Sequence, residues 1–399
     1  MNNIDRRTFL HTAALGCLGM ALPRFAFADA ATDSRFVLVI LRGALDGLAA
    51  VPPYADGNYA AMRGELAITA PDYKLDGLFG LHPSLEKLYE RYRANELVVF
   101  HAAASPYRER SHFDGQDMLE SGTSAVKTQD GWLNRALPAL PMARQRASDQ
   151  VAMALAQNIP LVLRGATRVN SWAPSRMPEA DSDTLHRIMD LYAEDPYFSS
   201  RLAAALKAES VADGMNGMED NDRRNPLNAI PAVASAAGKF LAAPDGARIA
   251  VIEGGGWDTH ANQGAERGQL ATRLRALDQA LDALRTSLGS AWAKTAVLVV
   301  TEFGRTVAIN GTRGTDHGTA SCAFLVGGAV AGGRVVTDWP GLARSALYQG
   351  RDLAPRIDLR SVFKGVLAAH LGANEAALET RVFPDSRAAK PLEGLLRSA

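Results

Sequence analysis

The sequence predicts an α/β fold with a mainly parallel sheet flanked by helices. The first observation is a set of short, continuous apolar runs, which are typical of strands buried on both faces of a parallel sheet. These runs cover residues 36–41, 97–100, 249–252 and 296–300. The second observation is a leucine stripe at spacings of three and four between the last two runs, from Leu270 to Leu288, which predicts one amphipathic helix.

Taken in order, the elements support this fold class. The run 36–41 ends at Arg42-Gly43, and a helix over 83–94 precedes the run 97–100. The two later runs with the leucine-striped helix form a strand–helix–strand unit, for which a right-handed crossover is the rule. Residues 323–326 predict one more strand and residues 359–371 a late helix. Alternation of strands and helices favours a parallel sheet.

Composition excludes several classes of protein. The chain has 399 residues, of which 47% are hydrophobic and 22% charged, so it is neither mainly disordered nor a multi-span membrane protein. Basic and acidic residues both number 43, so no positive excess exists to bind nucleic acid. No glycine-rich phosphate loop of a nucleotide-binding type follows a strand.

The N-terminus has the pattern of an export signal. The paired Arg6-Arg7 is followed by an apolar stretch too short to span a bilayer, and then by a small-residue cleavage motif ending at Ala28. We therefore expect residues 1–28 to be a twin-arginine signal peptide, recognised by the Tat translocon, which carries folded proteins. The expected product is periplasmic or secreted, without a stable membrane span, and retains Cys322 as a buried apolar residue.

Residues 29–399 are expected to form one domain. A polar, turn-rich segment at 209–225 interrupts the order of apolar elements and predicts an exposed loop between two halves of that domain.

Acidic and imidazole side chains follow the predicted strands, mostly with glycines nearby. Ligands of open α/β sheets gather where parallel strands end, and carboxylates and imidazoles bind divalent cations. Such ligands suit Zn²⁺ and, with more oxygen atoms among them, Mn²⁺, Mg²⁺ or Ca²⁺, with one or two ions. Each residue could instead be a turn former or an ion-pair partner. The candidate metal ligands are Asp46, Asp258, His260, Glu302, Asp316 and His317.

Three further residues are candidates for catalysis. Ser111 stands where a helix is expected to begin, so its hydroxyl is either an N-cap or a nucleophile favoured by the helix end. His112 could contact substrate or metal. Arg305 could hold an anionic substrate oxygen or pair with Glu302.

Several segments together resemble a bacterial exported family, domain of unknown function 1501. They are LRGALDGL, SPYRERSHFDGQDMLESG, GGWDTHANQG, TEFGRT and GTDHGTAS, within a resemblance that runs from about Phe36 to Asp385. The family resembles the alkaline phosphatase and sulfatase superfamily, which implies a three-layer α/β sandwich and a metal site, often dinuclear. In that resemblance Asp46, Asp258, His260 and His317 match metal ligands, and Ser111 matches the nucleophile.

The chain departs from the superfamily pattern at Glu302-Phe303, where Asp-His is usual. Phe303 cannot bind a metal, which places one of two cation positions in question. Two functions follow from the resemblance. One is an exported metal-dependent hydrolase of phosphate or sulfate esters, acting on an anionic small molecule or polysaccharide. The other is a non-catalytic protein of the same fold that binds a polysaccharide or an exported protein partner.

Overall fold

The computed structural model describes residues 33–144, 151–174, 182–212 and 226–397. The expected signal peptide lies outside these residues, as do residues 213–225 of the expected polar loop. The first part of that segment is helical, because helix α8 continues to Ala212.

A mixed sheet is the centre of the fold, and its order in the described residues is β10-β4-β9-β8-β1-β7-β5-β6, with β11 paired to β4. Strand β1 is parallel to both of its neighbours, β7 and β8, and β9 alone runs antiparallel between β8 and β4. The strands are β1 (Arg35–Leu41), β4 (Leu97–Ala104), β5 (Ala152–Leu155), β6 (Asn170–Ser171), β7 (Ile249–Gly254), β8 (Thr295–Thr301), β9 (Ser321–Val326), β10 (Arg334–Val336) and β11 (Ile357–Asp358).

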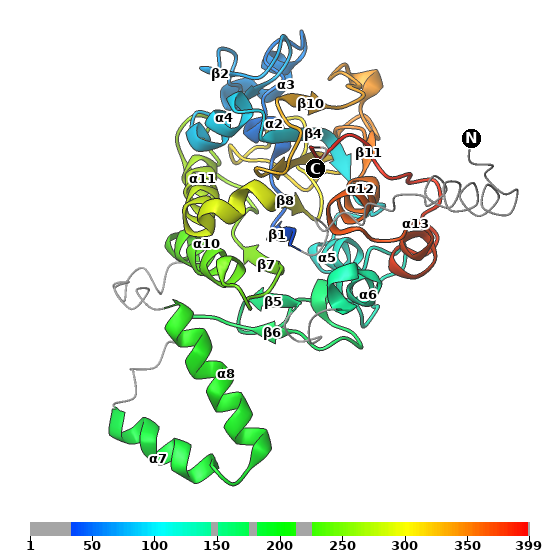
Figure 1. Cartoon of the computed structure of the whole chain (residues 1–399). Helices are drawn as coiled ribbons and strands as arrows, with labels where there is room; N and C mark the ends of the chain where they lie inside the picture. The colour runs from blue at the N-terminus through cyan, green and yellow to red at the C-terminus, as the bar shows by residue number, and fades with distance from the viewer. Residues whose placement is uncertain (1–32, 145–150, 175–181, 213–225, 398–399) are drawn as a thin grey trace, which may run out of the picture. The chain divides into compact units, whose positions relative to one another are not determined.

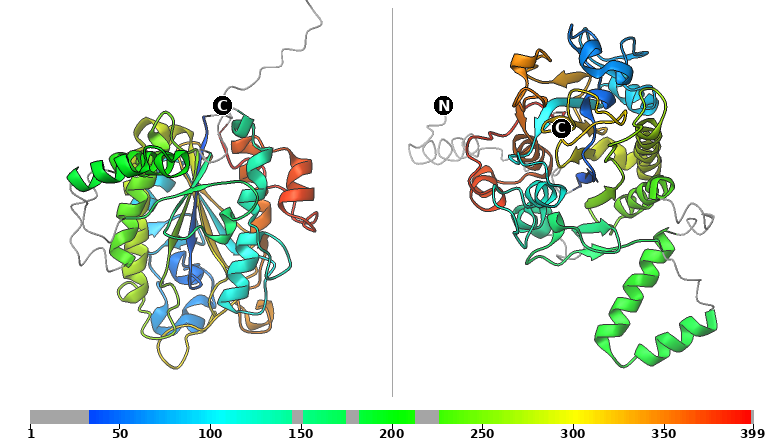
Figure 2. Two further views of the ribbon diagram at one scale, coloured as in Figure 1. Left: turned by 90° about the horizontal axis from the view of Figure 1, so that it is seen from below. Right: turned by 180° about the vertical axis from the view of Figure 1, so that it is seen from behind.

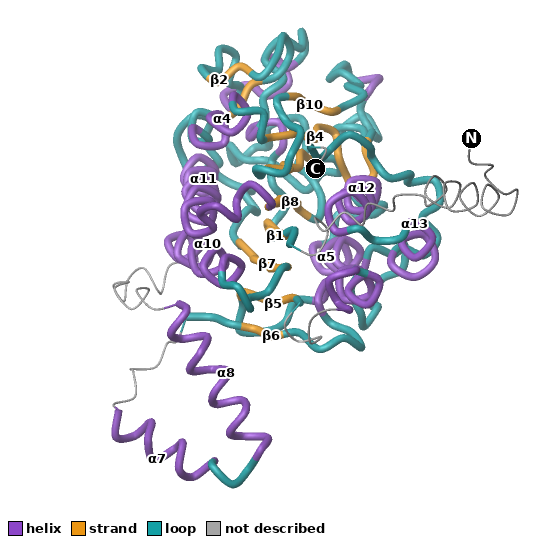
Figure 3. Tube along the Cα trace, viewed as in Figure 1, coloured by secondary structure: helices purple, strands orange, loops and turns teal. Residues whose placement is uncertain are grey.

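Helices cover both faces of this sheet, which gives three layers (Figures 1 and 2). The α/β class with a mainly parallel sheet is therefore confirmed. The tube in Figure 3 shows α4, α10 and α11 on one side and α5, α12 and α13 on the other. The main helices are α4 (Glu86–Arg93), α5 (His112–Ser121), α6 (Trp132–Ala136), α7 (Ser182–Tyr192), α8 (Pro196–Ala212), α10 (Pro226–Ala242), α11 (Gln269–Leu288), α12 (Leu359–Leu371) and α13 (Glu375–Ala377).

Smaller elements lie outside these layers. Helices α2 (Gly47–Ala50) and α3 (Tyr59–Arg63) follow β1, and β2 (Tyr73–Lys74) pairs with β3 (Gly80–Leu81). Helices α7 and α8 contact each other, and α8 contacts α10. Their exposed apolar side chains include Leu191 and Tyr197. No helix among the described residues is both long enough and apolar enough to cross a membrane.

The alternation of side chains along β1 explains how one strand supports two cores. Val37, Val39 and Leu41 pack in the cluster that includes α10 and α11. Phe36, Leu38 and Ile40 pack on the other face, against α6 and α12. Because both faces of β1 are buried, the strand is apolar from Phe36 to Leu41, which is the pattern that the sequence shows.

Parallel pairing brings three strand ends to one level. Leu41, the last residue of β1, is paired with Gly254 of β7 and with Thr301 of β8. The segments that follow these strands therefore leave the same edge of the sheet together. The polar residues singled out in the sequence lie in those segments.

Candidate metal centre

Four side chains meet at this edge, and we call them the histidine–aspartate cluster: His112, Asp258, His260 and His317. His112 is the first residue of α5, while the other three lie in loops that follow β7 and β8. Nε2 of His317 is 3.0 Å from Nε2 of His112 and 3.0 Å from Nε2 of His260. Asp258 closes the group, with Oδ1 at 3.0 Å from Nε2 of His260 and at 3.3 Å from Nε2 of His317.

The outer nitrogen of each cluster histidine contacts a group that can only accept a hydrogen bond. Nδ1 of His112 is 2.8 Å from Oε1 of Glu302, and Nδ1 of His317 is 2.9 Å from the carbonyl oxygen of Arg110. Nδ1 of His260 is 3.2 Å from Oδ1 of Asp316. These acceptors assign a proton to each Nδ1, and each ring, when neutral, then presents a lone pair at Nε2.

Lone pairs that face one another repel unless a cation lies between them. Three Nε2 atoms and the Asp258 carboxylate form a donor set suited to Zn²⁺. Tetrahedral ligands about 2.0–2.1 Å from such an ion lie about 3.3 Å apart, close to the separations seen here. The ligand atoms of His112, Asp258 and His317 all lie within 4.8 Å of one another. His260 is not part of that three-residue group and joins the cluster through His317 and Asp258. Partners that orient metal-binding histidines through the second nitrogen are the usual arrangement.

Arg305 holds the aspartate of the cluster. Its side chain is fully buried, donates from Nη1 to Oδ1 of Asp258, and donates from Nε and Nη2 to Thr315. Burial raises the pKa of Asp258, but the hydrogen bond and charge of Arg305 outweigh burial and hold that pKa below its usual value. All three donor nitrogens of Arg305 are engaged by protein groups, so it positions Asp258.

Glu302 is buried behind His112. Its Oε1 accepts from the backbone nitrogen of Gly43 at 2.8 Å and from Nε2 of Gln116 at 3.2 Å, in addition to His112. Its Oε2 is 2.9 Å from the hydroxyl of Thr301. Burial raises the pKa of Glu302, but the hydrogen bond from His112 and those from neighbouring groups lower it below the usual value. The ionised carboxylate orients His112 and lies outside the group of facing ligand atoms.

Two imidazoles of the cluster differ in their affinity for a proton. The hydrogen bond to Glu302 raises the pKa of His112. Burial lowers the pKa of His317, and the nearby charge of His112 lowers it further. His317, whose Nε2 lies between the other two, is therefore the more readily neutral of this pair.

The structure places Asp46 and Asp316 outside the cluster. Asp46 is buried, forms an ion pair with Arg63, accepts from Nε2 of Gln263 at 2.7 Å, and caps helix α2. These partners account for its carboxylate, so Asp46 does not join the facing atoms. Asp316 lies on the outer side of His260, where it orients that ring, and an additional hydrogen bond from Asn310 lowers its pKa.

Ser111 is the N-cap residue of α5 by its backbone, yet its hydroxyl makes no capping hydrogen bond. Its backbone nitrogen donates to the hydroxyl of Tyr107 at 2.8 Å, which fixes the start of the helix beside His112. An N-cap serine normally bonds the second or third helical N–H. The Ser111 hydroxyl therefore remains available to another partner.

Phe303 and Gln116 complete the surroundings of His112. Phe303 is buried and stacks on the His112 ring, with ring centroids 5.0 Å apart. Gln116 lies one helical turn after His112 and connects Glu302 to Arg42 through hydrogen bonds of 3.2 Å and 2.7 Å. Gln116 is not among the residues predicted from the sequence, although its spacing of four from His112 places both on one face of α5.

The sequence matches a family described as "Protein of unknown function (DUF1501)" over residues 99–381. The chain belongs to this family. A comparison of the DUF1501 chain with curated proteins finds no match.

Three solved structures are similar to the DUF1501 chain at low identity. The first, Ps i-CgsB in complex with k-i-k-neocarrahexaose, has 12% identity and a TM-score of 0.40, and covers 90% of this chain and 77% of its own. The second is the C-terminal periplasmic domain of EcEptC from Escherichia coli in complex with Zn, with 9% identity, a TM-score of 0.32, and coverage of 75% and 74%. The third is the phosphonate monoester hydrolase of Agrobacterium radiobacter, with 12% identity, a TM-score of 0.32, and coverage of 76% and 70%. At these scores none of the three tells what the DUF1501 chain binds or cleaves.

Proposed function

We propose that the protein is an exported metal-dependent hydrolase of phosphate or sulfate esters. The observation that carries this proposal is the convergence of three histidine Nε2 atoms on Asp258 while each Nδ1 donates to a protein acceptor. We assign His112, Asp258, His260 and His317 as ligands of one divalent cation. Three nitrogens and one carboxylate favour Zn²⁺ over Mg²⁺ or Ca²⁺, which prefer oxygen.

The cation would supply Lewis-acid chemistry, by polarising an oxygen of the ester group and favouring an ionised nucleophile. Ser111 is the proposed nucleophile, because its hydroxyl is not used for capping and it begins the helix that carries His112. A bond would form between Ser111 Oγ and phosphorus or sulfur, and the bond to the ester oxygen would break. The proton lost from Oγ to water would be balanced by one that the departing oxygen takes up from water, which releases the alcohol. Water then cleaves the ester on Ser111 and restores the hydroxyl.

Two residues act by positioning. Arg305 keeps Asp258 ionised and aimed at the histidines, and Glu302 keeps the His112 proton on Nδ1. Export through the twin-arginine route is part of the proposal and rests on the residues at the N-terminus. A cation could then be acquired during folding in the cytoplasm, before transport.

Metal analysis of the purified protein tests the proposal. We expect one ion per chain in the wild type and none in Asp258→Ala or His317→Ala. The control is His370→Gln, which changes a buried histidine that contacts the carbonyl oxygen of Arg35 in another part of the fold. Ser111→Ala should keep the ion but lose hydrolysis of 4-nitrophenyl phosphate and 4-nitrophenyl sulfate. Wild-type protein that binds no divalent cation would overturn the assignment.

A second function is favoured by Phe303. This buried ring occupies the position where the superfamily resemblance implies a histidine, and it leaves a single cation position beside His112. The alternative is a metal-binding protein without catalysis that holds a polysaccharide or an exported protein partner. Stoichiometric metal, no turnover of either ester, and retention of a glycan or protein from periplasmic extract would support this alternative.

A further inference from the structure

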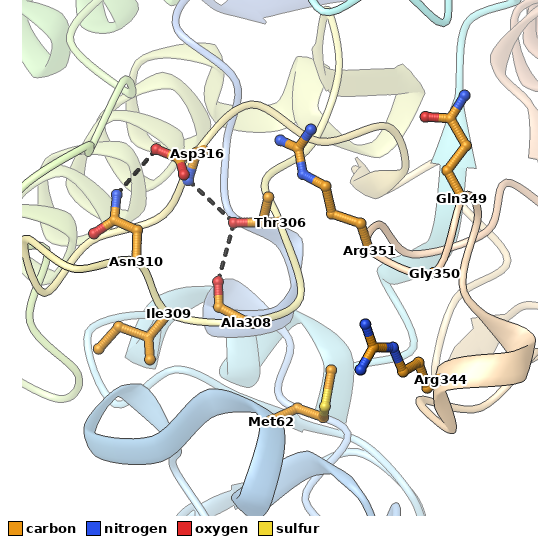
Figure 4. A pocket seen from close by; sticks show the side chains of 10 residues that line it. All are labelled: Met62, Thr306, Ala308, Ile309, Asn310, Asp316, Arg344, Gln349, Gly350 and Arg351. Carbon is orange, nitrogen blue, oxygen red and sulfur yellow. Dashed lines mark hydrogen bonds between the residues drawn. The ribbon is translucent and has the colours of Figure 1, made fainter.

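A cavity of about 550 Å³ lies beside the histidine–aspartate cluster. The loop that follows β8 lines one side of it, and the segment around residues 344–351 lines the other (Figure 4). Met62 and Ile309 supply an apolar wall, and Arg344, Gln349 and Arg351 supply the polar wall. The cavity has the size of an ordinary small-molecule site and mixes apolar and polar lining in the usual way.

Two contacts join this cavity to the cluster. Asp316 lines the cavity, and its Oδ1 is 3.2 Å from Nδ1 of the cluster residue His260. Arg351 also lines the cavity, and its Nη2 donates to the carbonyl oxygen of the cluster residue His317. The cavity therefore adjoins the two loops that carry His260 and His317, on the outer side of the His260 ring.

The cavity carries an excess of positive charge. The side chain of Arg344 is exposed and makes no hydrogen bond or ion pair with other residues that the structure describes. The nearest acidic partner of Arg351 is Asp352, at 3.5 Å, and that carboxylate is already shared with Arg110 at 2.8 Å and Thr319 at 2.7 Å. The carboxylate within the cavity, Asp316, accepts from Asn310 and contacts His260. Arg344 thus has no carboxylate partner, and Arg351 shares Asp352 with Arg110.

We propose that this cavity binds a second oxyanion of the substrate, a phosphate or sulfate group, while the first lies at the cluster. This inference rests on the proposed hydrolase function and deepens it, because it makes the substrate an ester with at least two anionic groups. Arg344 recognises the second group by charge and by its planar fork of donors, which suits tetrahedral oxyanions. Met62 and Ile309 contact the carbon skeleton between the two groups.

Matched aryl probes test the inference. The pairs are phenyl phosphate with 1,3-phenylene bisphosphate, and phenyl sulfate with 1,3-phenylene disulfate, titrated calorimetrically into the metal-loaded protein. We expect the wild type to bind the bis-ester of one pair about tenfold more tightly than the mono-ester, roughly 1.4 kcal/mol. The pair that shows the preference distinguishes phosphate from sulfate.

Substitutions at Arg344 test whether the tighter binding of the bis-ester depends on this residue. Arg344→Gln should remove the bis-ester preference, and Arg344→Lys should keep part of it, with metal content unchanged in both. The control is Arg275→Gln, which removes the same charge from an exposed position on α11 outside the cavity. Equal binding of both esters by the wild type, or an undiminished preference in Arg344→Gln, would overturn the inference.

The outcomes for the cavity and for catalysis are separable. A preference that depends on Arg344, without cleavage of any ester, supports the cavity and overturns the hydrolase. Cleavage of mono- and bis-esters with equal KM supports the hydrolase and overturns the cavity.

Discussion

Each histidine of the cluster depends on a partner that fixes one nitrogen. For His112 that partner is Glu302, which is itself held by Gly43, Gln116 and Thr301. Such partners determine both the proton position and the ring orientation, so their loss weakens a metal site without removing a ligand. Metal affinity can therefore distinguish a residue that binds the cation from a residue that only orients a ligand.

Glu302→Gln should lower zinc affinity by about 10–100-fold, because an amide is a weaker acceptor for His112 and adds donors to a site full of donors. A competition titration with a chromophoric chelator measures the affinity. Glu253→Gln is the matched control, since Glu253 bonds Arg42 at 2.7 Å and lies further from the cluster. Unchanged affinity in Glu302→Gln would show that its carboxylate does not support His112.

The thiol of Cys322 should not react with Ellman's reagent in native protein that lacks residues 1–28. Burial raises the pKa of this thiol, and the side chain is 2% exposed, so neither the thiolate nor access is present. Addition of denaturant should release one thiol per chain. Rapid stoichiometric reaction without denaturant would contradict the buried position of Cys322.

At the scale of elements, two glycines in the loops around the cluster, Gly304 and Gly314, have no space for a side chain. A Cβ on Gly304 would lie 1.9 Å from the carbonyl oxygen of Ala320, and one on Gly314 would lie 2.3 Å from that of His260. These loops carry Arg305, Asp316 and His317. A shift of the loop backbone would therefore move residues of the cluster and the residues that orient them. The close approach of neighbouring backbone therefore explains why glycine stands at positions 304 and 314.

Gly304→Ala should destabilise the fold by about 1–3 kcal/mol, the usual range for overpacking, and reduce metal content. Urea denaturation and metal analysis measure the two effects. Gly57→Ala is the control, because a Cβ there meets nothing within 4 Å. If Gly304→Ala matched Gly57→Ala in both measurements, the loop would be less tightly packed than described.

Asp278 of α11 accepts from the backbone nitrogens of Lys87 and Leu88 and thereby caps α4. Burial raises its pKa from 3.8 to about 6, so the folded protein binds this proton more tightly than the unfolded chain. The stabilisation from this group is complete below the unfolded pKa and is lost as pH rises through the folded pKa.

The free energy of unfolding of the wild type, relative to Asp278→Asn, should therefore fall between about pH 4 and about pH 7. Urea titrations at intervals across this range measure the difference. Asp338→Asn, which removes an exposed carboxylate that pairs with Arg356 and lies on neither α4 nor α11, is the control. A difference that grows with rising pH would contradict the raised pKa of Asp278.

The sequence predicts those helices and strands whose buried side chains form a regular apolar pattern. Strands β1, β4, β7 and β8 and helix α11 follow from apolar runs and the leucine stripe, and the strand at 323–326 is confirmed as β9. The antiparallel direction of β9 and the short strands β6, β10 and β11 have no such signal. Their pairing depends on contacts between distant parts of the chain.

At the scale of the whole molecule, the candidate site was partly foreseeable. Asp258, His260 and His317 stand near strand ends in glycine-rich segments, and the parallel strands bring them together. Asp46 has the same context in the sequence, yet Arg63 and Gln263, from distant elements, take its carboxylate. Sequence spacing cannot distinguish a ligand from an ion-pair partner, because that difference is decided by tertiary neighbours.

Removal of the cation should lower the melting temperature of the whole domain, because an ion that binds only the folded state stabilises it by mass action. At a free zinc concentration of 100 times Kd this amounts to about 2.7 kcal/mol. Calorimetric scans with EDTA and with added zinc measure the shift. The Asp258→Ala variant, which lacks a proposed ligand, serves as the control and should melt at one temperature in both conditions. A wild type insensitive to both additions would argue against a cation in the folded state.

The position of β1 between β7 and β8 has a consequence for biosynthesis. Phe36 pairs with Ile249 on one side and Ala296 on the other, so both partners emerge from the ribosome more than 200 residues later. The nascent chain thus carries an apolar strand that has neither neighbour until β7 emerges, and that lacks its second neighbour until translation passes Thr301. Folding of the domain is for this reason post-translational or nearly so, and a transporter that accepts only finished cargo would have to wait for it.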